Sequence, residues 1–519
     1  MSSSDRRSTT SAPPNVLFIT GNGHGLGHLT RMLAVANRSA DRFRPIFLTS
    51  SQAYPLVRDF GYAVEYLPSY LRLGMARVDW EPVFGSRLSG LVTNIGPRAV
   101  VIDHINPPRS LLNVRADCQG VDFIWSRRGM WRANRNREAI RLASSFDAVV
   151  EPRDLAGPID VGLTSKYHAG VAFVAPVVLV DTTQQVERDV ARQKLGIPRT
   201  GRAILVQLSD SDPTTLPALI RQVRDVVTSL ARDENVHLFA PLHPLHDEWK
   251  SSVDGVIMQA VYPMATYVRA FDGVVSTAGY NSFHETIASG LPAVVVSRDA
   301  DRLDDQARRA EFVELCGRGF FAPSVNDPMF RRAVERMMAH GETAIASSVT
   351  QELGEFDGAA QFADLIAARV ELRSREPLIT NHETRFEPAP AQALGQILSG
   401  RNRAEGHKGE RVVLVALGFD RVALDELVQS VVAMQETNPV SPIFLIDDVE
   451  SRHLDKCDFQ FESIMSSGEH REYTDHRYEQ YVRDCVDGLK FRYQTDSAVT
   501  LFPHQVEQSA SVLRKAFQT

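Results

Sequence analysis

Short apolar runs alternate with helical segments along the first third of the chain. The first run, Asn15–Thr20, lies between a proline and a glycine and predicts a buried parallel strand. A helical stretch follows at Leu29–Ala40. We predict further strands at Arg44–Thr49, Ala63–Tyr66, Ala99–Asp103, Val121–Trp125 and Ala148–Val150. This alternation is typical of an open parallel sheet with helices on both faces.

The same alternation begins again after a connector that runs from Val177 to Thr200. The apolar run Arg202–Leu208 opens a second α/β half. Its other predicted strands are Val236–Ala240, Gly255–Gln259, Gly273–Ser276 and Ala293–Val296. Two such halves leave a cleft between them, and ligands of parallel sheets bind beyond the carboxyl ends of the strands.

A smaller α/β unit is predicted near the end of the chain. It contains a strand at Arg411–Leu417, a helix at Leu424–Met434 and a strand at Pro442–Ile446. No period-type internal repeat is evident along the chain. The polar stretch before it is typical of a linker. We therefore divide the chain into a disordered tail (1–14), an N-terminal Rossmann-like domain (15–176), a C-terminal Rossmann-like domain (177–372), a linker (373–409) and a small module (410–519).

Composition narrows the class of protein. The chain has 519 residues, enough for two or three domains, and its 43% hydrophobic and 23% charged residues are typical of globular proteins. A net charge of −7 argues against nucleic-acid binding, which needs a basic surface. The four scattered cysteines form no C-x-x-C pair, so we predict no metal site. We expect neither a signal peptide nor a membrane-spanning helix. A cytoplasmic location follows, with peripheral contact at the inner face of the membrane as an open alternative.

A glycine-rich loop, Gly21–His28, joins the first strand to the first helix. A dinucleotide fingerprint fails because Leu26 or His28 falls where its last glycine belongs, and the chain has no G-K-[ST] phosphate loop. NAD and ATP are therefore disfavoured. His28 lies at the positive end of a helix, which favours a neutral ring that can act as a base. In the alternative interpretation, His24 and His28 only bind loop backbone.

A second segment, Ser276–Glu285, joins a strand to a helix in the C-terminal half. Gly279 is expected to permit a sharp turn, and the helix should run from Tyr280 to Ser289. The first amides of that helix would face a diphosphate, and the Glu285 carboxylate would accept two ribose hydroxyls. The residues that supply these amides are Tyr280, Asn281 and Ser282. The alternative is an ordinary strand–turn–helix with a stabilising glutamate.

Three acidic segments are weaker candidates. The loop Asp299–Gln306 follows the strand Ala293–Val296, so its polar groups could hold sugar hydroxyls, although a solvated loop is the simpler interpretation. The pairs Asp210-x-Asp212 and Asp447-Asp448 could hold a metal-bound diphosphate, but short acidic pairs are also common in loops and helix caps.

Four motifs occur in a fixed order along residues 15–370. They are G-x-G-H-x-x-R at Gly25–Arg31, G-Y-N-[ST]-x-x-E at Gly279–Glu285, G-x-P at Gly290–Pro292 and an acidic-Gln pair at Asp305–Ala310. Together they resemble the MurG-like branch of the GT-B glycosyltransferases, and more closely a set of bacterial glycosyltransferases with the G-Y-N form. The resemblance implies an α/β protein of the GT-B class, with two Rossmann-like parallel-sheet domains facing a cleft. The small C-terminal α/β module lies outside the resemblance.

The resemblance also implies a nucleotide-sugar donor, usually a UDP-sugar, which is a co-substrate rather than a cofactor. His28 is then the catalytic candidate beside an acceptor-side loop. Members of that loop are His24, Gly25, Gly27 and Arg31. The implied donor-binding residues are Ser276, Gly279, Tyr280, Asn281, Ser282, Glu285, Asp305 and Gln306. Arg31 and Arg298 are candidates for stabilising the leaving diphosphate without a metal.

The chain departs from the family after its first C-terminal strand, where Leu208-Ser-Asp-Ser replaces a glycine-rich turn. That departure puts phosphate contacts there in doubt. The leading hypothesis is transfer of a sugar to an unknown glycan, lipid-linked or small-molecule acceptor, in a setting such as cell-envelope or exopolysaccharide assembly. Two alternatives stay open. One is a nucleotide-sugar hydrolase of the kind used in pseudaminic acid synthesis, and the other is a GT-B-like scaffold that only binds partners.

Overall fold

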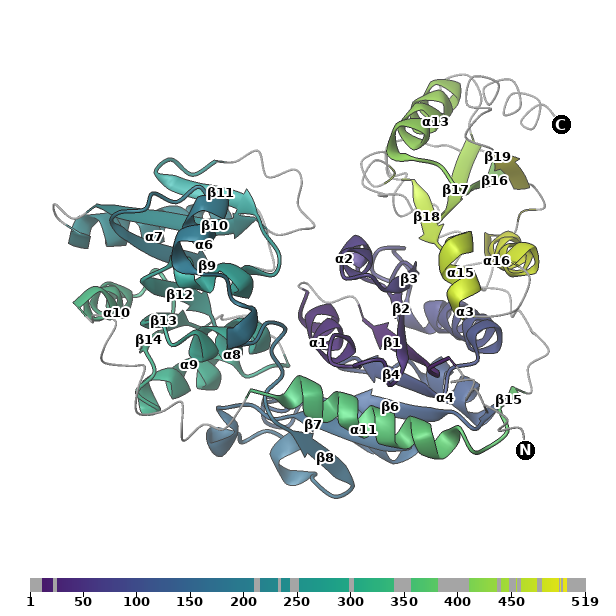
Figure 1. Ribbon diagram of the computed structural model, residues 1–519, viewed down its shortest axis with the longest axis horizontal. Coiled ribbons are helices and arrows are strands. Elements are labelled where there is room, and N and C mark those ends of the chain that lie inside the picture. Colours follow the sequence, from purple (N-terminus) through teal and green to yellow (C-terminus); the bar gives the residue numbers. More distant parts are fainter. Residues whose placement is uncertain are drawn as a thin grey trace, which may run out of the picture.

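Two parallel sheets with helices on both faces form the two halves of the molecule, which confirms the α/β class (Figure 1). The computed structural model describes residues 12–21, 26–209, 215–231, 235–242, 252–297, 303–339, 356–380, 410–435, 440–447, 454, 459–473, 478–493, 495 and 498–501. Among these residues, no helix is long and apolar enough to cross a membrane.

The N-terminal sheet is built around β1 (Asn15–Thr20), which pairs in parallel with β2 (Arg44–Thr49) and β4 (Ala99–Asp103). The remaining strands of this half are β3 (Ala63–Tyr66), β6 (Asp122–Ser126), β7 (Ala148–Pro152) and β8 (Val171–Val174). Its helices are α1 (Gly27–Ala36), α2 (Tyr54–Asp59), α3 (Arg77–Ile95), α4 (Arg109–Ala116) and α5 (Arg137–Leu142). All these strands run parallel in the order β3-β2-β1-β4-β6-β7-β8.

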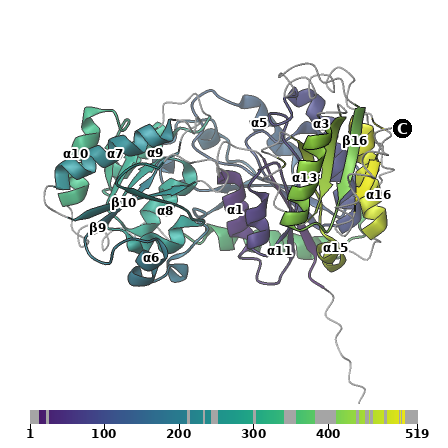
Figure 2. The ribbon, with the colours of Figure 1, turned by 90° about the horizontal axis from the view of Figure 1, so that it is seen from above.

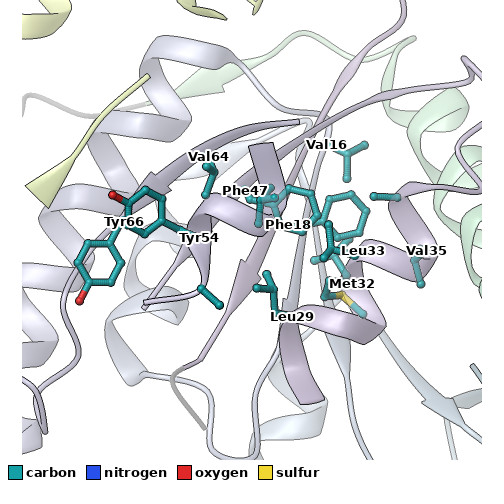
Figure 3. Packing of buried hydrophobic residues seen from close by; sticks show 14 of the residues in the cluster. Val16, Phe18, Leu29, Met32, Leu33, Val35, Phe47, Tyr54, Val64 and Tyr66 are labelled. Carbon is teal, nitrogen blue, oxygen red and sulfur yellow. The ribbon is translucent and has the colours of Figure 1, made fainter. Parts of the chain in front are cut away.

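Every residue of β1 is buried, because helices cover both faces of the sheet. Val16 and Phe18 pack toward α1, where the Phe18 ring stacks on Phe47 (Figure 3). Leu17 and Ile19 point to the other face and pack with α3 and α4. This arrangement fixes the carboxyl end of β1 and hence the place where the glycine-rich loop leaves the sheet.

The C-terminal sheet has the order β11-β10-β9-β12-β13-β14, again with parallel pairing. Its strands are β9 (Arg202–Gln207), β10 (Val236–Leu242), β11 (Val256–Ala260), β12 (Gly273–Thr277), β13 (Ala293–Val296) and β14 (Phe320–Ala322). Its helices are α6 (Arg188–Lys194), α7 (Leu216–Ala231), α8 (Tyr280–Ser289), α9 (Gln306–Leu315) and α10 (Pro328–Ala339). The five predicted strands of this half agree with β9 to β13 within two residues at each end.

Helix α11 (Gly358–Arg373) returns to the N-terminal half, where it runs along the face of the sheet that also carries α1 (Figure 1). Asp122 at the start of β6 accepts hydrogen bonds from Arg369 Nε and Arg373 Nε, both at 2.6 Å. The range 177–372 that was drawn for the C-terminal domain therefore includes a helix that packs on the N-terminal sheet. A short antiparallel pair, β5 (Cys118–Gln119) with β15 (Ile379–Thr380), follows α11.

The C-terminal unit does not form a separate sheet. Its strands continue the N-terminal sheet to eleven strands, because β18 pairs antiparallel with the edge strand β3. Its elements are β16 (Glu410–Ala416), α13 (Arg421–Gln435), β17 (Val440–Ile446), β18 (Gln460–Ser463), α15 (Ser467–Tyr473), α16 (Tyr478–Tyr493) and β19 (Ala498–Leu501). Figure 2 shows α13 and α16 on opposite sides of β16.

Candidate active site

A buried cluster of a histidine, an aspartate and an arginine lies at the carboxyl end of the N-terminal sheet. Asp103 is the last residue of β4, and its carboxylate accepts hydrogen bonds from Arg31 Nε (2.9 Å), Arg31 Nη2 (2.6 Å) and Ser126 Oγ (2.9 Å). His28 Nδ1 contacts the same carboxylate. His28 and Arg31 both lie in the first turn and a half of α1. The parallel order β1-β4-β6 brings these distant residues together.

The chemistry of His28 follows from this cluster. Burial lowers the pKa of His28, and Asp103 offsets only part of that effect, so the ring is neutral at pH 7. Burial alone would raise the pKa of Asp103, but Arg31 and His28 together hold it well below its usual range. The ionised Asp103 favours a proton on Nδ1 of His28. Nε2 is then left with a lone pair, which is the form that a general base needs.

Gly21 is needed for close packing beside this cluster. A Cβ atom at Gly21 would lie 2.2 Å from Cδ2 of His104. The His104 ring stacks against His28 with centroids 6.1 Å apart, and its Nδ1 accepts the Asn106 amide at 3.0 Å. Burial is the main reason that the pKa of His104 falls to about 3, so His104 is a neutral packing group.

A pocket opens next to His104 on the N-terminal half. The ends of β1 and β4, the turn after β3 and the first turns of α3 line it, and its empty space of about 530 Å³ is partly open to solvent. Tyr70, Trp80 and Phe84 supply aromatic walls, and Arg77 supplies a positive charge. Such walls suit the apolar face of a sugar or another flat group.

The N-terminus of α8 faces this cluster from the C-terminal half. Gly279 lies in the short turn between β12 and α8 with φ −65° and ψ 150°, angles that any residue adopts, so the turn itself does not require a glycine. A Cβ atom at Gly279 would meet nothing within 4 Å. The glycine therefore leaves open space in front of the first amides of α8, where an anion is stabilised.

Two side chains of α8 reach across to the N-terminal half. Asn281 Nδ2 donates to the Gly27 carbonyl at 3.3 Å, while its buried Oδ1 has no partner among the described residues. The Tyr280 hydroxyl donates to the Arg153 carbonyl and accepts the Val177 amide, each at 3.1 Å. Tyr280 thus links the two halves by hydrogen bonds, whereas Oδ1 of Asn281 remains able to accept a hydrogen bond from a ligand.

Glu285 lies one turn further along α8, and it has no hydrogen bond or ion pair with any described residue. Burial raises its pKa to about 7. A partly buried carboxylate without a partner is costly unless a ligand supplies hydrogen-bond donors. Glu285 is therefore suited to accept hydrogen bonds from a pair of neighbouring hydroxyls.

The two serines predicted to bind the donor differ in position. Ser276 is fully buried in β12, and its hydroxyl donates to the Thr277 carbonyl at 3.2 Å. Ser282 lies half-buried on α8. Only Ser282 therefore has a side chain with access to a ligand, while Ser276 shapes the strand that precedes Gly279.

A buried ion-pair network fixes the start of α9 against the N-terminal half. Arg309 donates to Asp154 at 2.8 Å and to both oxygens of Asp304 at 3.0 and 2.8 Å. Burial alone would raise the pKa of Asp304, but Arg309 and Arg128 hold it well below its usual range. The network lies between the halves, since Asp154 follows β7.

The predicted sugar-binding pair Asp305 and Gln306 begins this same helix. The Asp305 carboxylate caps α9 by accepting the Arg308 amide at 3.3 Å, so it faces its own helix. Gln306 Nε2 donates to Asp304 at 3.4 Å, and its buried Oε1 has no partner among the described residues. Gln306 therefore keeps a free acceptor, whereas Asp305 is engaged in the cap.

Arg128 was not predicted, yet it lies close to both groups. Its Nη1 is 3.9 Å from Asp304, its buried Nε has no partner among the described residues, and its charge lowers the pKa of His28. Arg31 is held by Asp103 through Nε and Nη2, while its buried Nη1 has no partner among the described residues. Arg128 lies two residues after β6, in a loop where an arginine carries no distinguishing sequence signal.

Some predicted residues cannot be placed. His24, Gly25, Arg298 and the pair Asp210 and Asp212 lie outside the described residues. The Asp447 carboxylate accepts a hydrogen bond from the Gly418 amide at 2.8 Å. Both residues belong to the C-terminal unit, far from the cleft. Within the described residues, no group of three His, Cys, Asp or Glu side chains could hold a metal ion.

Comparison with known proteins adds a distant relative. No family model matches the chain. The curated UDP-N-acetylglucosamine--N-acetylmuramyl-(pentapeptide) pyrophosphoryl-undecaprenol N-acetylglucosamine transferase of Clavibacter sepedonicus is 23% identical over 376 residues, which span 70% of this chain and 99% of the relative.

Solved structures of glycosyltransferases are also similar. The glycosyltransferase of kitacinnamycin covers 69% of this chain and all of its own, with 16% identity and a TM-score of 0.49. MurG of Acinetobacter baumannii covers 69% of this chain and all of its own, with 13% identity and a TM-score of 0.43. With its ordered motifs, its two sheets and its match along 99% of a curated relative, the chain is a distant homologue of MurG-like glycosyltransferases and has the α/β architecture of the GT-B type.

Proposed function

We propose that the chain transfers a sugar from a nucleoside-diphosphate sugar to a hydroxyl of an acceptor held by the N-terminal half. The observation that carries this proposal is Glu285, a partly buried carboxylate without a partner among the described residues, on the helix whose N-terminus is left open by Gly279. UDP is the expected nucleotide, since the relative from C. sepedonicus is named for a UDP-sugar.

In this proposal the first amides of α8 bind the diphosphate, and Glu285 accepts the two ribose hydroxyls. The unpartnered oxygens of Asn281 and Gln306 accept hydroxyls of the donor. Gly279 has no side chain that could block the phosphates. Asp305 supports the site by capping α9.

The chemical step uses His28. Its Nε2 removes the proton of an acceptor hydroxyl while that oxygen attacks the anomeric carbon of the donor. The bond between the anomeric carbon and the diphosphate oxygen breaks, and the diphosphate leaves with its charge stabilised by the α8 amides and Arg128. Asp103 and Arg31 hold His28 in the required tautomer and orientation.

Transfer fits the site better than its alternatives. The pocket lined by His104, whose ring stacks on His28, gives an acceptor a place to bind that a hydrolase would not need. A binding scaffold would have no use for a neutral histidine held by an ionised aspartate. The relative's printed name includes an undecaprenol-linked acceptor, and an acceptor of that kind would bring the chain to the inner face of the membrane.

The ribose assignment predicts the behaviour of Glu285→Gln. We expect this variant to lose most of the thermal stabilisation that UDP gives to the wild-type protein, because an amide accepts hydroxyls at only one atom. Thermal shift with UDP, GDP and dTDP measures the effect. Glu311→Gln on the exposed face of α9 is the matched control and should bind UDP normally. Equal stabilisation of the Glu285 variant and the wild type would refute the assignment.

A second measurement separates transfer from hydrolysis. UDP release from a panel of UDP-sugars should be slow in buffer and rise when glycan or lipid-linked acceptors are added. Fast stoichiometric release without any acceptor would overturn the transferase proposal in favour of the hydrolase.

A further inference from the structure

The C-terminal unit repeats the strand order of the first part of the N-terminal half. In sheet order the N-terminal unit reads β3-β2-β1-β4 and the C-terminal unit reads β18-β17-β16-β19. Both units therefore arrange their strands as third, second, first and fourth along the chain. Helices α1 and α13 pack on one face of the common sheet, while α3 and α16 pack on the other.

The register of the second and third strands is also the same in both units. Each paired residue of the C-terminal unit lies 397 positions after its counterpart. The outer pairs are Ile46↔Ala63 and Thr49↔Tyr66 in the N-terminal unit, and Ile443↔Gln460 and Ile446↔Ser463 in the C-terminal unit. At the same spacing, the sequence Pro-Ile-Phe-Leu of residues 45–48 recurs at residues 442–445.

Further equivalent positions share their burial. Val57 in α2 and Leu454 in the C-terminal unit are both fully buried in the same apolar cluster. Glu65 on β3 corresponds to Glu462 on β18, and both are buried. Conserved burial at a constant spacing indicates a common fold of the two units.

The two units meet around a pseudo-two-fold axis. Strands β18 and β3 are antiparallel, and the residues that face each other are Ser463 and Tyr66, which occupy equivalent positions. Two like units that touch at the same position are related as the subunits of a two-fold dimer. Figure 1 shows the C-terminal unit standing against the β3 side of the N-terminal half.

The catalytic cluster of the N-terminal half has no counterpart in the C-terminal unit. Leu501 lies opposite the last residue of β16, as Asp103 lies opposite the last residue of β1. Helix α13, which follows β16 as α1 follows β1, contains no histidine. At these positions the C-terminal unit therefore lacks both the aspartate and the histidine that could hold or move a proton.

The interface between the two units, here called the seam, is buried and specific. Glu65 Oε2 lies 3.0 Å from Arg87 Nε in an ion pair, and the Glu65 carboxylate accepts a hydrogen bond from the Tyr481 hydroxyl of the other unit. Arg87 Nη1 donates to Cys485 Sγ at 2.9 Å. These charged and polar groups are all buried, so they need each other as partners. The seam therefore has the features of a lasting interface between subunits.

A stacked aromatic pair and an arginine complete the seam. The rings of Tyr66 and Phe461 stack with centroids 5.1 Å apart. Arg58 of α2 donates to the Asp447 carbonyl at 2.5 Å and to Ser463 Oγ at 3.3 Å.

We propose that residues 410–501 are a second, catalytically inactive copy of the first part of the N-terminal domain. This copy occupies, within the same chain, the edge of β3 at which two such domains would otherwise pair as a dimer. An uncovered edge strand is open to pairing with other chains, and the copy removes that exposure. The proposal does not depend on the sugar-transfer reaction.

A disulfide across the axis tests the docking. In the full chain, Tyr66→Cys with Ser463→Cys places two thiols at directly opposed positions, within the reach of a disulfide. Mild oxidation should link them within one chain, seen as a faster-migrating monomer on a non-reducing gel. The control Thr49→Cys with Ser463→Cys lies one strand further away and should not link. A covalent dimer, or equal linking in the control, would overturn docking within the chain.

A second variant keeps the proposal testable should the cysteines disturb folding. Tyr481→Phe removes only the hydroxyl that bonds Glu65 and should lower the thermal midpoint of the full chain by a few degrees. Tyr167→Phe, at an exposed position, should leave it unchanged. Equal midpoints for the two variants would show that this contact does not hold the copy, and would overturn the docking.

Discussion

At the scale of single residues, His28 is a buried ionisable group and Glu285 a partly buried one, and their surroundings differ. His28 has Asp103 on one ring nitrogen, and Arg31 holds that aspartate in turn. Glu285 has no partner among the described residues. A satisfied histidine is suited to repeated proton transfer, whereas an unsatisfied carboxylate is suited to binding a ligand.

His28→Ala is expected to lower kcat by about 10²–10⁴-fold and to leave UDP binding unchanged, because general-base catalysis contributes that much. In the wild type, burial lowers the pKa of His28 below its ordinary value of about 6.5. The ring is then neutral at and above pH 7, so kcat should be flat there and fall only in more acidic buffer. A pH–rate profile checks this, and a rate that rises steadily from pH 7 to 9 would contradict it.

Glu285 gives a different pH dependence, in binding rather than in rate. Its pKa is about 7 in the empty site, and a ribose prefers the ionised carboxylate, which accepts at both oxygens. Affinity for an intact UDP-sugar should therefore increase from pH 6 to pH 8. Titration calorimetry measures it, and Glu285→Gln should abolish the dependence. A pH-independent affinity in the wild type would contradict the prediction.

Residues with chemical roles were only partly predictable from the sequence. His28 and Glu285 stood in recognisable motifs, while Asp103 ended a correctly predicted strand without being linked to His28. The link needs the strand order β1-β4-β6, which a single sequence does not state. Arg128 was missed because an arginine in a loop has no distinguishing local pattern.

At the scale of elements, the two glycines at strand ends have opposite requirements. Gly279 has ordinary backbone angles and open space, whereas Gly21 has the His104 ring where a Cβ would be. Gly279 is needed for binding a ligand, whereas Gly21 is needed for the packing of the fold.

This contrast predicts two alanine variants. Gly279→Ala should change the thermal midpoint little, because the lower entropy of the unfolded chain is offset by the poor fit of alanine as the N-cap of α8, but it should weaken UDP binding. Gly21→Ala should lower the midpoint, because the new Cβ would displace His104. Thermal melts with and without UDP compare them. Normal UDP affinity in Gly279→Ala would place the phosphates elsewhere.

Strands were predicted better than helices. β1, β2, β3, β4 and β13 match their predicted ranges in full, because apolar runs bounded by glycine or proline carry a clear signal. The longest helix, α3, was not predicted. It contains Pro82, Gly85 and Gly90, which are poor helix formers, and tertiary packing overrides their propensity.

At the scale of the whole molecule, α11 binds the C-terminal half back to the N-terminal sheet. Asp122→Asn should destabilise the protein by about 1–3 kcal/mol, because the buried carboxylate loses its charge toward Arg369 and Arg373. Asp364→Asn on α11 is the control, since the ion pair between Asp364 and Arg42 is exposed and should contribute little to stability. Denaturant unfolding compares the two. Equal midpoints would show that this contact does not anchor α11.

The duplicated unit escaped sequence analysis for a physical reason. Burial fixes the size and polarity of a side chain far more than its identity, so two copies can keep one fold with few identical residues. Only the run Pro-Ile-Phe-Leu survived as a visible match. The strand register revealed the relation between the two units, which most of their residues no longer show.

The chain crosses between the two halves twice, and the crossings lie side by side. Gln361 of α11 accepts the Ala175 amide at 2.8 Å, and Gly358 packs so closely on the Ala175 carbonyl that a Cβ would lie 1.8 Å from it. Because both connections cross at one place, each restrains the other. The C-terminal half is thereby held with the N-terminus of α8 toward His28, in line with the hydrogen bonds of Tyr280 and Arg309 between the halves.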